Sequence, residues 1–303
     1  MNIENIIHEL NKGVDKKNIY LDEKMSKHTT FKVGGNADVF VCPNNIKELS
    51  HVIKVCNILD VPYFVIGNGS NIIVKDNGFR GVIIQVYKNL SDVCIKDGTI
   101  VAGAGIMLSK LAKIIAEESL EGFEFASGIP GTLGGAIYMN AGAYGGDMSQ
   151  VLVSADVVDQ QGNIITLTRD ELKLGYRTSI LQQSNHIVVS GVLKCERGNK
   201  DTIACLIQNL NNKRKEKQPL NFPSAGSTFK RPEGYYAGKL IMDSGLRGYK
   251  IGDAQVSEKH CGFIINKGNA TANDIISLIN YVKVNVEDKF GVELQTEVKI
   301  IGE

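Results

Sequence analysis

The chain has 303 residues, enough for two or three domains, and its 43% hydrophobic and 22% charged residues are ordinary for a globular protein. The net charge is +1 and is not segregated, since residues 1–150 carry 14 Lys and Arg against 16 Asp and Glu; this argues against a basic face for nucleic acid. The six cysteines include no C-x-x-C pair, which favours reduced cysteines in a cytoplasmic protein. The sequence does not begin with a basic segment followed by an apolar run, so we expect no signal peptide. No apolar run approaches the ~20 residues of a membrane span, so we expect no membrane insertion.

The first third of the chain predicts a β-α-β block that ends near residue 88. Residues 1–27 form a polar helical segment followed by a loop in this interpretation. Asn44 or Asn45 is a candidate cap for a helix whose apolar positions recur between residues 46 and 59. The expected strands are 39–42, 61–67 and 81–86.

Strands dominate the next hundred residues. Asp97-Gly98 and Gln161-Gly162-Asn163 are typical of hairpin turns. One helix interrupts the strands, with Leu108, Leu111, Ala112 and Ile115 on one face. The expected strands are 92–95, 99–102, 151–159, 163–167 and 186–195.

Beyond residue 200 the pattern becomes helical again. A helix over 200–218 ends in the positive run KRKEK, which complements the helix dipole, and Pro219 stops it. Thr271 and Asp274 predict a capping box for a second helix, and LQTEVKII (294–301) predicts a strand. The resulting domains are an N-terminal helical segment (1–27), a domain over 28–195 with two subdomains divided near 88, and a domain over 196–303.

Two glycine-rich stretches raise the question of function. IGNGSN (66–71) directly follows a predicted strand, and GIPGTLGGAIYMNAGAYGG (128–146) has seven glycines and no charge. Neither contains G-x-G-x-x-G, and no P-loop motif occurs. Backbone N–H groups in tight turns form concave anion sites, and glycine allows close approach to phosphate oxygens. Both stretches are therefore candidates for contact with a diphosphate, the alternative being ordinary turns between strands.

The chain contains six notable segments in this order: HTTFKVGG (28–35), VIGNGSN (65–71), SGIPGTLGGAIYMNAGAYGGD (127–147), YRTS (176–179), SAGSTFKRP (224–232) and TEVKIIG (296–302). Together they resemble the UDP-N-acetylenolpyruvoylglucosamine reductase family, and the resemblance extends from residue 28 to residue 302. It implies an α+β protein with a two-part FAD-binding domain of the vanillyl-alcohol-oxidase (PCMH) type and a C-terminal α+β substrate-binding domain. The chain has no long insertion between YRTS and SAGS, and in this it resembles the shorter, second type of the family.

The family's activity implies a cytoplasmic step of bacterial peptidoglycan synthesis. NADPH reduces the enolpyruvyl ether of a UDP-sugar to UDP-N-acetylmuramate through non-covalent FAD, and no obligate protein partner is evident. The resemblance places the glycine stretches along FAD. The implied cofactor-binding residues are Gly67, Asn68, Gly69, Ser70, Asn71, Gly131, Thr132, Gly134, Gly135, Asn140, Ala141 and Gly142.

The resemblance also implies three catalytic residues. Ser227 matches the family's proton donor, and its hydroxyl can serve only within hydrogen-bond reach of the carbon that gains the proton. Arg177 matches the catalytic arginine, whose guanidinium forks onto a carboxylate, and Glu297 is the third residue, stabilising the intermediate with Arg177. Without the resemblance, a loop serine, an exposed arginine and a solvated strand face are the ordinary interpretations.

The remaining implied contacts concern the substrate. Tyr176 lines the sugar side, and Arg214 and Lys217 meet the diphosphate. Thr228 and Arg231 stand where related enzymes often carry a hydrophobic residue and an asparagine, so the nucleotide contact of that asparagine is in doubt and Arg231 could meet a phosphate instead.

No histidine pair has metal-ligand spacing, so we expect no metal, and a structural or supporting role for His260. Two alternatives remain open. An FAD-linked oxidase of the same fold shares the glycine stretches, and a non-catalytic UDP-sugar-binding module explains the cations at 214 and 217.

Overall fold

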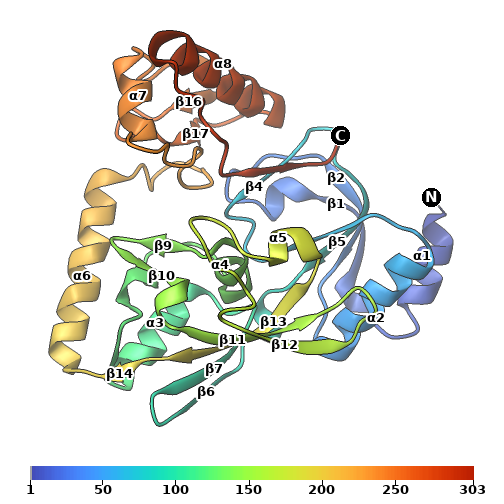
Figure 1. Cartoon of the computed structure of the whole chain (residues 1–303). Coiled ribbons are helices and arrows are strands. Elements are labelled where there is room, and N and C mark those ends of the chain that lie inside the picture. The colour runs from blue at the N-terminus through green and yellow to red at the C-terminus, as the bar shows by residue number, and fades with distance from the viewer. Residues whose placement is uncertain (1) are drawn as a thin grey trace. The chain divides into compact units, whose positions relative to one another are not determined.

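The computed structural model describes residues 2–303 and shows an α+β chain (Figure 1). It separates into two compact units. The first contains the chain through Leu21, residues 38–68 and residues 81–213; the second contains residues 22–37, 69–80 and 214–303. The functional limits expected from the sequence, 28–195 and 196–303, stay a prediction. The compact units instead divide within the helix that follows residue 200, and they assign two early segments to the unit that contains residues 214–303.

A four-stranded sheet has the order β1-β2-β5-β3, with β3 parallel to β5. Helix α2 (Ile46–Ile58) is capped by the Asn45 side chain, which accepts from the N–H of Glu48, and it buries Leu49, Val52, Ile53 and Cys56. The predicted cap and apolar face of this helix are confirmed. The strands are β1 (Ile19–Lys24), β2 (Asn36–Val41), β3 (Tyr63–Ile66) and β5 (Phe79–Gln85).

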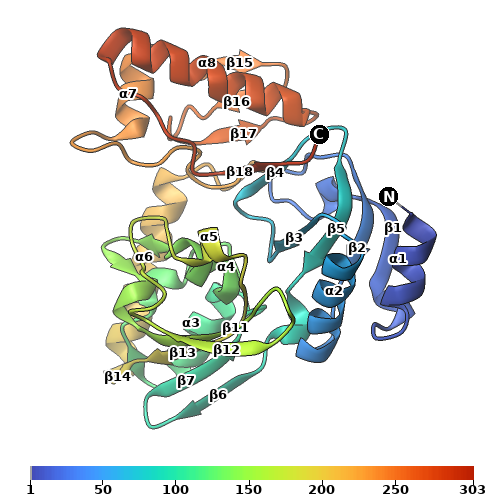
Figure 2. The same cartoon turned by 45° about the vertical axis from the view of Figure 1, so that its right-hand side comes forward.

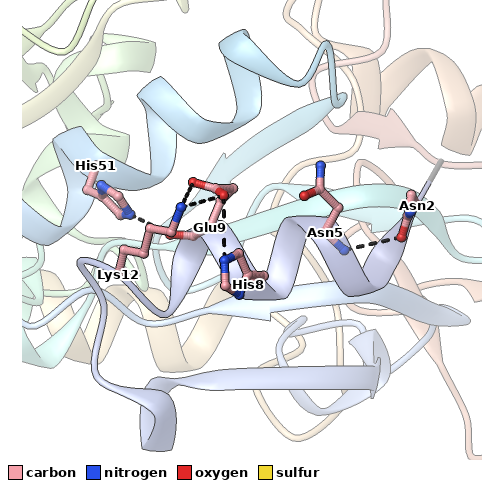
Figure 3. Close-up of polar contacts among 6 residues, drawn as sticks. All are labelled: Asn2, Asn5, His8, Glu9, Lys12 and His51. Carbon is pink, nitrogen blue, oxygen red and sulfur yellow. Dashed lines mark hydrogen bonds and ion pairs between the residues drawn. The ribbon is translucent and has the colours of Figure 1, made fainter.

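Helix α1 (Ile3–Leu10) packs on α2 (Figure 3), and it buries Ile6 and Leu10 in the same hydrophobic core. His51 Nε2 lies 2.9 Å from the backbone oxygen of Glu9, whose carboxylate accepts from Lys12 Nζ at 2.6 Å. The expected helical segment over residues 1–27 is wrong beyond residue 10 apart from short 3-10 turns, because residues 19–24 form β1. That strand was missed because it lies at the edge of its sheet and buries none of its residues fully, so its sequence lacks an apolar alternation.

A five-stranded antiparallel sheet forms the rest of the first unit, in the order β12-β11-β13-β7-β6. Both predicted hairpins are confirmed. Asp97 and Gly98 have φ of +49° and +72°, as a two-residue turn of the primed type requires. Helix α4 packs on this sheet (Figure 1), with Leu133 and Ile137 against Gly191. The elements are β6 (Val93–Lys96), β7 (Thr99–Gly103), α3 (Leu108–Glu117), α4 (Leu133–Met139), β11 (Leu152–Val158), β12 (Ile164–Thr168) and β13 (Ile187–Lys194).

In the second unit, helix α8 (Ala272–Phe290) covers a three-stranded sheet (Figure 2). The predicted capping box is confirmed by Thr271 and Asp274, each of which accepts from the backbone N–H of the other. The predicted strand at 294–301 is shorter than expected: only β18 (Lys299–Ile301) is regular, and it runs parallel to β4 (Ile72–Val74). The sheet and its neighbouring helix are β15 (Lys250–Ile251), β16 (Ala254–Val256), β17 (Ile264–Asn266) and α7 (Ala237–Asp243).

Helix α6 (Lys200–Lys217) confirms the predicted helix and ends two residues before Pro219. No helix within residues 2–303 is long and apolar enough to span a membrane. Short elements complete the described chain: η1 (Lys16–Asn18), η2 (Met25–Lys27), η3 (Lys88–Leu90), β8 (Leu120–Glu121), η4 (Glu124–Ala126), β9 (Gly142–Ala143), β10 (Gly146–Asp147), η5 (Met148–Gln150), α5 (Leu181–Ser184) and β14 (Glu196–Arg197).

Asp76→Ala should destabilise the second unit by about 1 kcal/mol, because the Asp76 carboxylate accepts from the N–H groups of Ala272 and Asn273, both at 2.8 Å, and so caps α8 from a distant part of the chain. Urea unfolding followed by circular dichroism would measure the loss. Asp288→Asn, at an exposed position near the other end of α8, should change stability by less than about 0.5 kcal/mol. Equal effects of the two substitutions would contradict the capping role.

Candidate functional site

The backbone at residues 69–71 carries three consecutive N–H groups in the second unit. Gly69 has φ of +63°, and its carbonyl accepts from the N–H of Thr30 at 3.1 Å. Among the described residues, the N–H groups of Gly69, Ser70 and Asn71 donate to no protein acceptor. Consecutive free N–H groups at a left-handed turn suit the oxygens of a phosphate or diphosphate.

The first residues of the same stretch contact the second glycine stretch within the first unit. Asn68 Nδ2 donates to the Pro130 carbonyl at 2.7 Å. A Cβ on Gly67 would lie 2.2 Å from Thr132 Oγ1, so only glycine fits at this position. The structure therefore brings the two stretches together at residues 67–68 and 130–132.

The second glycine stretch is fixed by its own polar contacts. Thr132 caps α4, and Gly134 packs so closely that an added Cβ would lie 3.0 Å from the Cβ of Ala104. Asn140 ends the helix in the left-handed region at φ +42°. Its amide donates to the Gly175 carbonyl at 3.0 Å and accepts from the Ser149 N–H at 3.0 Å. The side chain of Asn140 thus ties the end of α4 to the chain just before the predicted catalytic arginine.

Arg177 lies against the end of this stretch. Its Nη2 donates to the carbonyl of Gly142 at 2.9 Å, and its own carbonyl accepts from Gln182 Nε2 at 3.0 Å. Its φ of +54° is unfavourable for a residue with a side chain and persists only where neighbours hold it. The exposed ring of Tyr176 lies 5.5 Å from the guanidinium carbon. The Arg177 guanidinium is therefore held beside Gly142, and Gly142 is one of the predicted cofactor-binding residues.

In the second unit, Glu297 is hydrogen-bonded to Thr228, the residue that directly follows Ser227. The Glu297 N–H donates to the Thr228 carbonyl at 2.8 Å, and the Lys230 N–H donates to the Gln295 carbonyl at 2.8 Å. Thr228 is buried, whereas Ser227 is exposed and follows Gly226, which has φ of +73°. Ser227 thus projects outward from an anchored segment.

The same pairing extends to the loop of free N–H groups. Asn71 Nδ2 donates to the Glu297 carbonyl at 3.3 Å, and the Asn71 carbonyl accepts from the Lys299 N–H at 3.0 Å. Ser227, Glu297 and residues 69–71 therefore share one framework in this unit. No sequence pattern indicates the central position of Thr228, which differs from the hydrophobic residue that related enzymes often carry there.

Two of the predicted substrate cations lie at the end of α6. Arg214 and Lys217 lie in the last turn of α6, with Lys217 exposed. The Lys259 ammonium donates to the Lys215 carbonyl and so holds that helix end. The guanidinium carbon of Arg231 lies 3.9 Å from the centroid of the Tyr236 ring, and the Arg231 Nε donates to the Tyr235 carbonyl at 3.2 Å.

All six cysteines are free thiols. Burial raises the pKa of Cys56 to about 12 and that of Cys195 to about 11, so neither is a thiolate nucleophile near neutral pH. Within residues 2–303 no cluster of three or more His, Cys, Asp or Glu side chains could hold a metal ion.

The fold and the family comparisons together identify an FAD-binding protein of the vanillyl-alcohol-oxidase type. Residues 37–168 match the family model described as an FAD binding domain, and residues 218–301 match the C-terminal domain of UDP-N-acetylenolpyruvoylglucosamine reductase. The glucose dehydrogenase Phl p 4.0202 shares the fold, with a TM-score of 0.52 over 64% of this chain and 44% of that chain, at 14% identity.

The chain belongs to the UDP-N-acetylenolpyruvoylglucosamine reductase family. It is 51% identical to the reductase of Lachnoclostridium phytofermentans, over 98% of this chain and 97% of that protein. It is 50% identical to the reductase of Clostridioides difficile over the full length of both. The crystal structure of the reductase from Thermus caldophilus has a TM-score of 0.80 at 32% identity, covering 94% of this chain and 98% of that chain.

Gly69→Ala should release FAD, because the new Cβ would lie 1.9 Å from the His28 carbonyl oxygen at a φ already unfavourable for alanine. We expect at least a tenfold loss of FAD affinity, about 1.4 kcal/mol, measured by flavin fluorescence during titration of the apoprotein. Gly234→Ala is a matched control: its φ is +73°, but nothing lies within 4 Å of the added Cβ. Equal FAD affinity in both variants would refute the close-approach argument.

Proposed function

We propose that this chain reduces UDP-N-acetylenolpyruvoylglucosamine to UDP-N-acetylmuramate in the cytoplasm, with NADPH as the electron donor. The reaction consumes one NADPH and one proton, and it converts the carbon–carbon double bond of the enolpyruvyl ether into a single bond. Bound FAD supplies the two-electron carrier between NADPH and the substrate. The observation that carries this proposal is the shared framework of Ser227, Glu297 and residues 69–71, in a chain that is about half identical to reductases of this name.

The proposed roles follow from what the reduction requires. One alkene carbon gains a hydride, the neighbouring carbon gains a proton, and the carboxylate must be stabilised while negative charge builds on it. Ser227 provides the proton from an exposed hydroxyl on an anchored backbone. Arg177 pairs with the substrate carboxylate, since a guanidinium matches that group with two donors. Glu297 acts with Arg177 on the intermediate.

Binding is divided between backbone and side chains. The N–H groups of residues 69–71 are the proposed donors to the FAD diphosphate, and the glycine stretch at 131–142 lies along the cofactor. Arg214 and Lys217 are the proposed partners of the UDP diphosphate, and Tyr176 contacts the sugar. Experiments can test these assignments one at a time, because reduction of the flavin by NADPH and its reoxidation by the UDP-sugar are measured as separate half-reactions.

Ser227→Ala should slow reoxidation of reduced enzyme by the UDP-sugar about 10²–10⁴-fold, the usual contribution of general acid catalysis. Reduction by NADPH should keep its wild-type rate, because that step needs no proton from Ser227. Anaerobic stopped-flow absorbance in the flavin bands measures both steps. Ser244→Ala is the control, since the Ser244 hydroxyl only donates to the Leu240 carbonyl at the end of α7. Wild-type reoxidation by Ser227→Ala would remove the proton-donor role.

If the UDP-sugar does not reoxidise the reduced wild-type enzyme and only oxygen does, the result would favour the oxidase alternative. A folded protein that binds the UDP-sugar and takes up no FAD would favour the binding module. Either result would overturn the proposed reaction, whatever the variants show.

Lys217→Ala should raise the KM for the UDP-sugar about tenfold, as expected for loss of an ion pair of about 1.4 kcal/mol, with little change in the rate of flavin reduction. Lys215→Ala is the matched control. Lys215 lies two residues before Lys217 in α6, so its side chain is on another face of the helix, while the change in charge is identical. Steady-state kinetics with varied UDP-sugar measures the difference. An unchanged KM in Lys217→Ala, or equal increases in both variants, would refute the specific contact.

A further inference from the structure

His260 occupies a defined place behind the Ser227 segment in the second unit. Its Nδ1 accepts a hydrogen bond from the Gly262 N–H at 3.2 Å. Its ring meets Phe263 edge-on with centroids 5.0 Å apart. An added Cβ would lie 3.4 Å from His260 Cε1 if it were on Gly238 and 3.0 Å if it were on Gly262, so two glycines leave room for the imidazole.

The Gly262 peptide connects this ring to the proposed catalytic segment. The carbonyl of Gly262 accepts from the Thr228 N–H at 2.9 Å, and the Thr228 carbonyl accepts from the Glu297 N–H at 2.8 Å. One line of hydrogen bonds therefore runs from His260 Nδ1 through Gly262 and Thr228 to Glu297. Ser227 is the residue directly before Thr228, so its position depends on the same line.

We propose that His260 is a positioning residue: its unprotonated Nδ1 fixes the Gly262 peptide, and through it the Thr228 backbone that sets Ser227 and Glu297. This inference rests on the proposed function for its catalytic consequence and on geometry alone for the hydrogen bond. The ring need not touch the substrate, because it acts through the backbone of Gly262, whose N–H and carbonyl belong to two successive peptide groups.

The chemistry of imidazole supports this arrangement. A backbone N–H can donate only to an unprotonated ring nitrogen, so Nδ1 is the acceptor and the proton of the neutral ring is on Nε2. Burial lowers the pKa of His260 and so favours this neutral form, although the local backbone hydrogen bond acts in the opposite direction. The Ser257 hydroxyl accepts from the His260 N–H at 3.3 Å and holds the backbone of the same turn.

Two variants separate an acceptor from mere packing. His260→Asn places an amide oxygen near the position of Nδ1, whereas His260→Leu fills space without an acceptor. We expect His260→Leu to slow reoxidation of the reduced enzyme by the UDP-sugar about 10- to 100-fold, because a displacement near 1 Å at a reacting group has effects of this size. His260→Asn should stay within about threefold of wild type, and both variants should be reduced by NADPH at the wild-type rate.

Equal slowing by both variants, or no slowing by His260→Leu, would overturn the proposal. Losses in both half-reactions in proportion to the folded fraction, judged by thermal unfolding, would also overturn it and leave only a packing role.

A spectroscopic measurement stays informative if the UDP-sugar reaction itself fails. Long-range ¹H–¹⁵N correlation spectra of histidine-labelled holoenzyme at neutral pH should show His260 Nδ1 as the unprotonated nitrogen and Nε2 as the protonated one. The Gly262 amide should also exchange faster with solvent in His260→Leu than in His260→Asn. A ring protonated on Nδ1, or equal exchange in the two variants, would refute the hydrogen bond independently of the enzyme's activity.

Discussion

The pairing of the Thr228 backbone with Glu297 is the interaction on which the arrangement of the second unit most depends. Thr228 is 1% exposed and makes three bonds: its N–H to Gly262, its carbonyl from Glu297, and its hydroxyl from the Ile264 N–H at 3.1 Å. A buried peptide that lost any of these partners would pay for desolvation without compensation. The anchored Thr228 lets its neighbour Ser227 remain exposed and still be held in position.

The first unit uses a different device at the end of α4. Asn140 and Arg177 both adopt positive φ, a conformation that costs a residue with a side chain about 1–3 kcal/mol. Hydrogen bonds to Gly175, Ser149, Gly142 and Gln182 surround the two residues and offset that cost. A guanidinium held in advance loses little freedom when a carboxylate arrives, which is how rigid positioning increases rate.

Local signals in the sequence predicted most of the fold. The Asn45 cap, the Asp97-Gly98 turn and the capping box at Thr271 each depend on residues within a few positions of one another, so a single sequence carries them in full. Strand β1 and the shortened strand at 299–301 depend on distant partners and on sheet edges, which no local pattern encodes.

The site divides in the same way. Glycine content predicted close approach of the backbone to a ligand. The structure shows close approach to protein atoms, Gly67 to Thr132 and Gly69 to His28, and contact with FAD stays a prediction. The roles of Ser227, Arg177 and Glu297 came from the resemblance, because each residue alone has an ordinary interpretation. Thr228 and the peptide of Gly262 act through backbone atoms, which the identity of a side chain does not reveal.

Strand β4 and the loop before it have a consequence for the order of folding. The Asn71 side chain binds a carbonyl 226 residues further along the chain, and β4 pairs with β18, which is made later still. Contacts of such long sequence separation form late, since loop closure precedes any gain from them. On the ribosome, the Gly69 carbonyl has an early partner in Thr30, whereas Asn71 and β4 emerge long before their partners Glu297 and β18 are synthesised. The turn at residues 69–71 is encoded early and completed last, so a chain that still lacks β18 has no finished turn there.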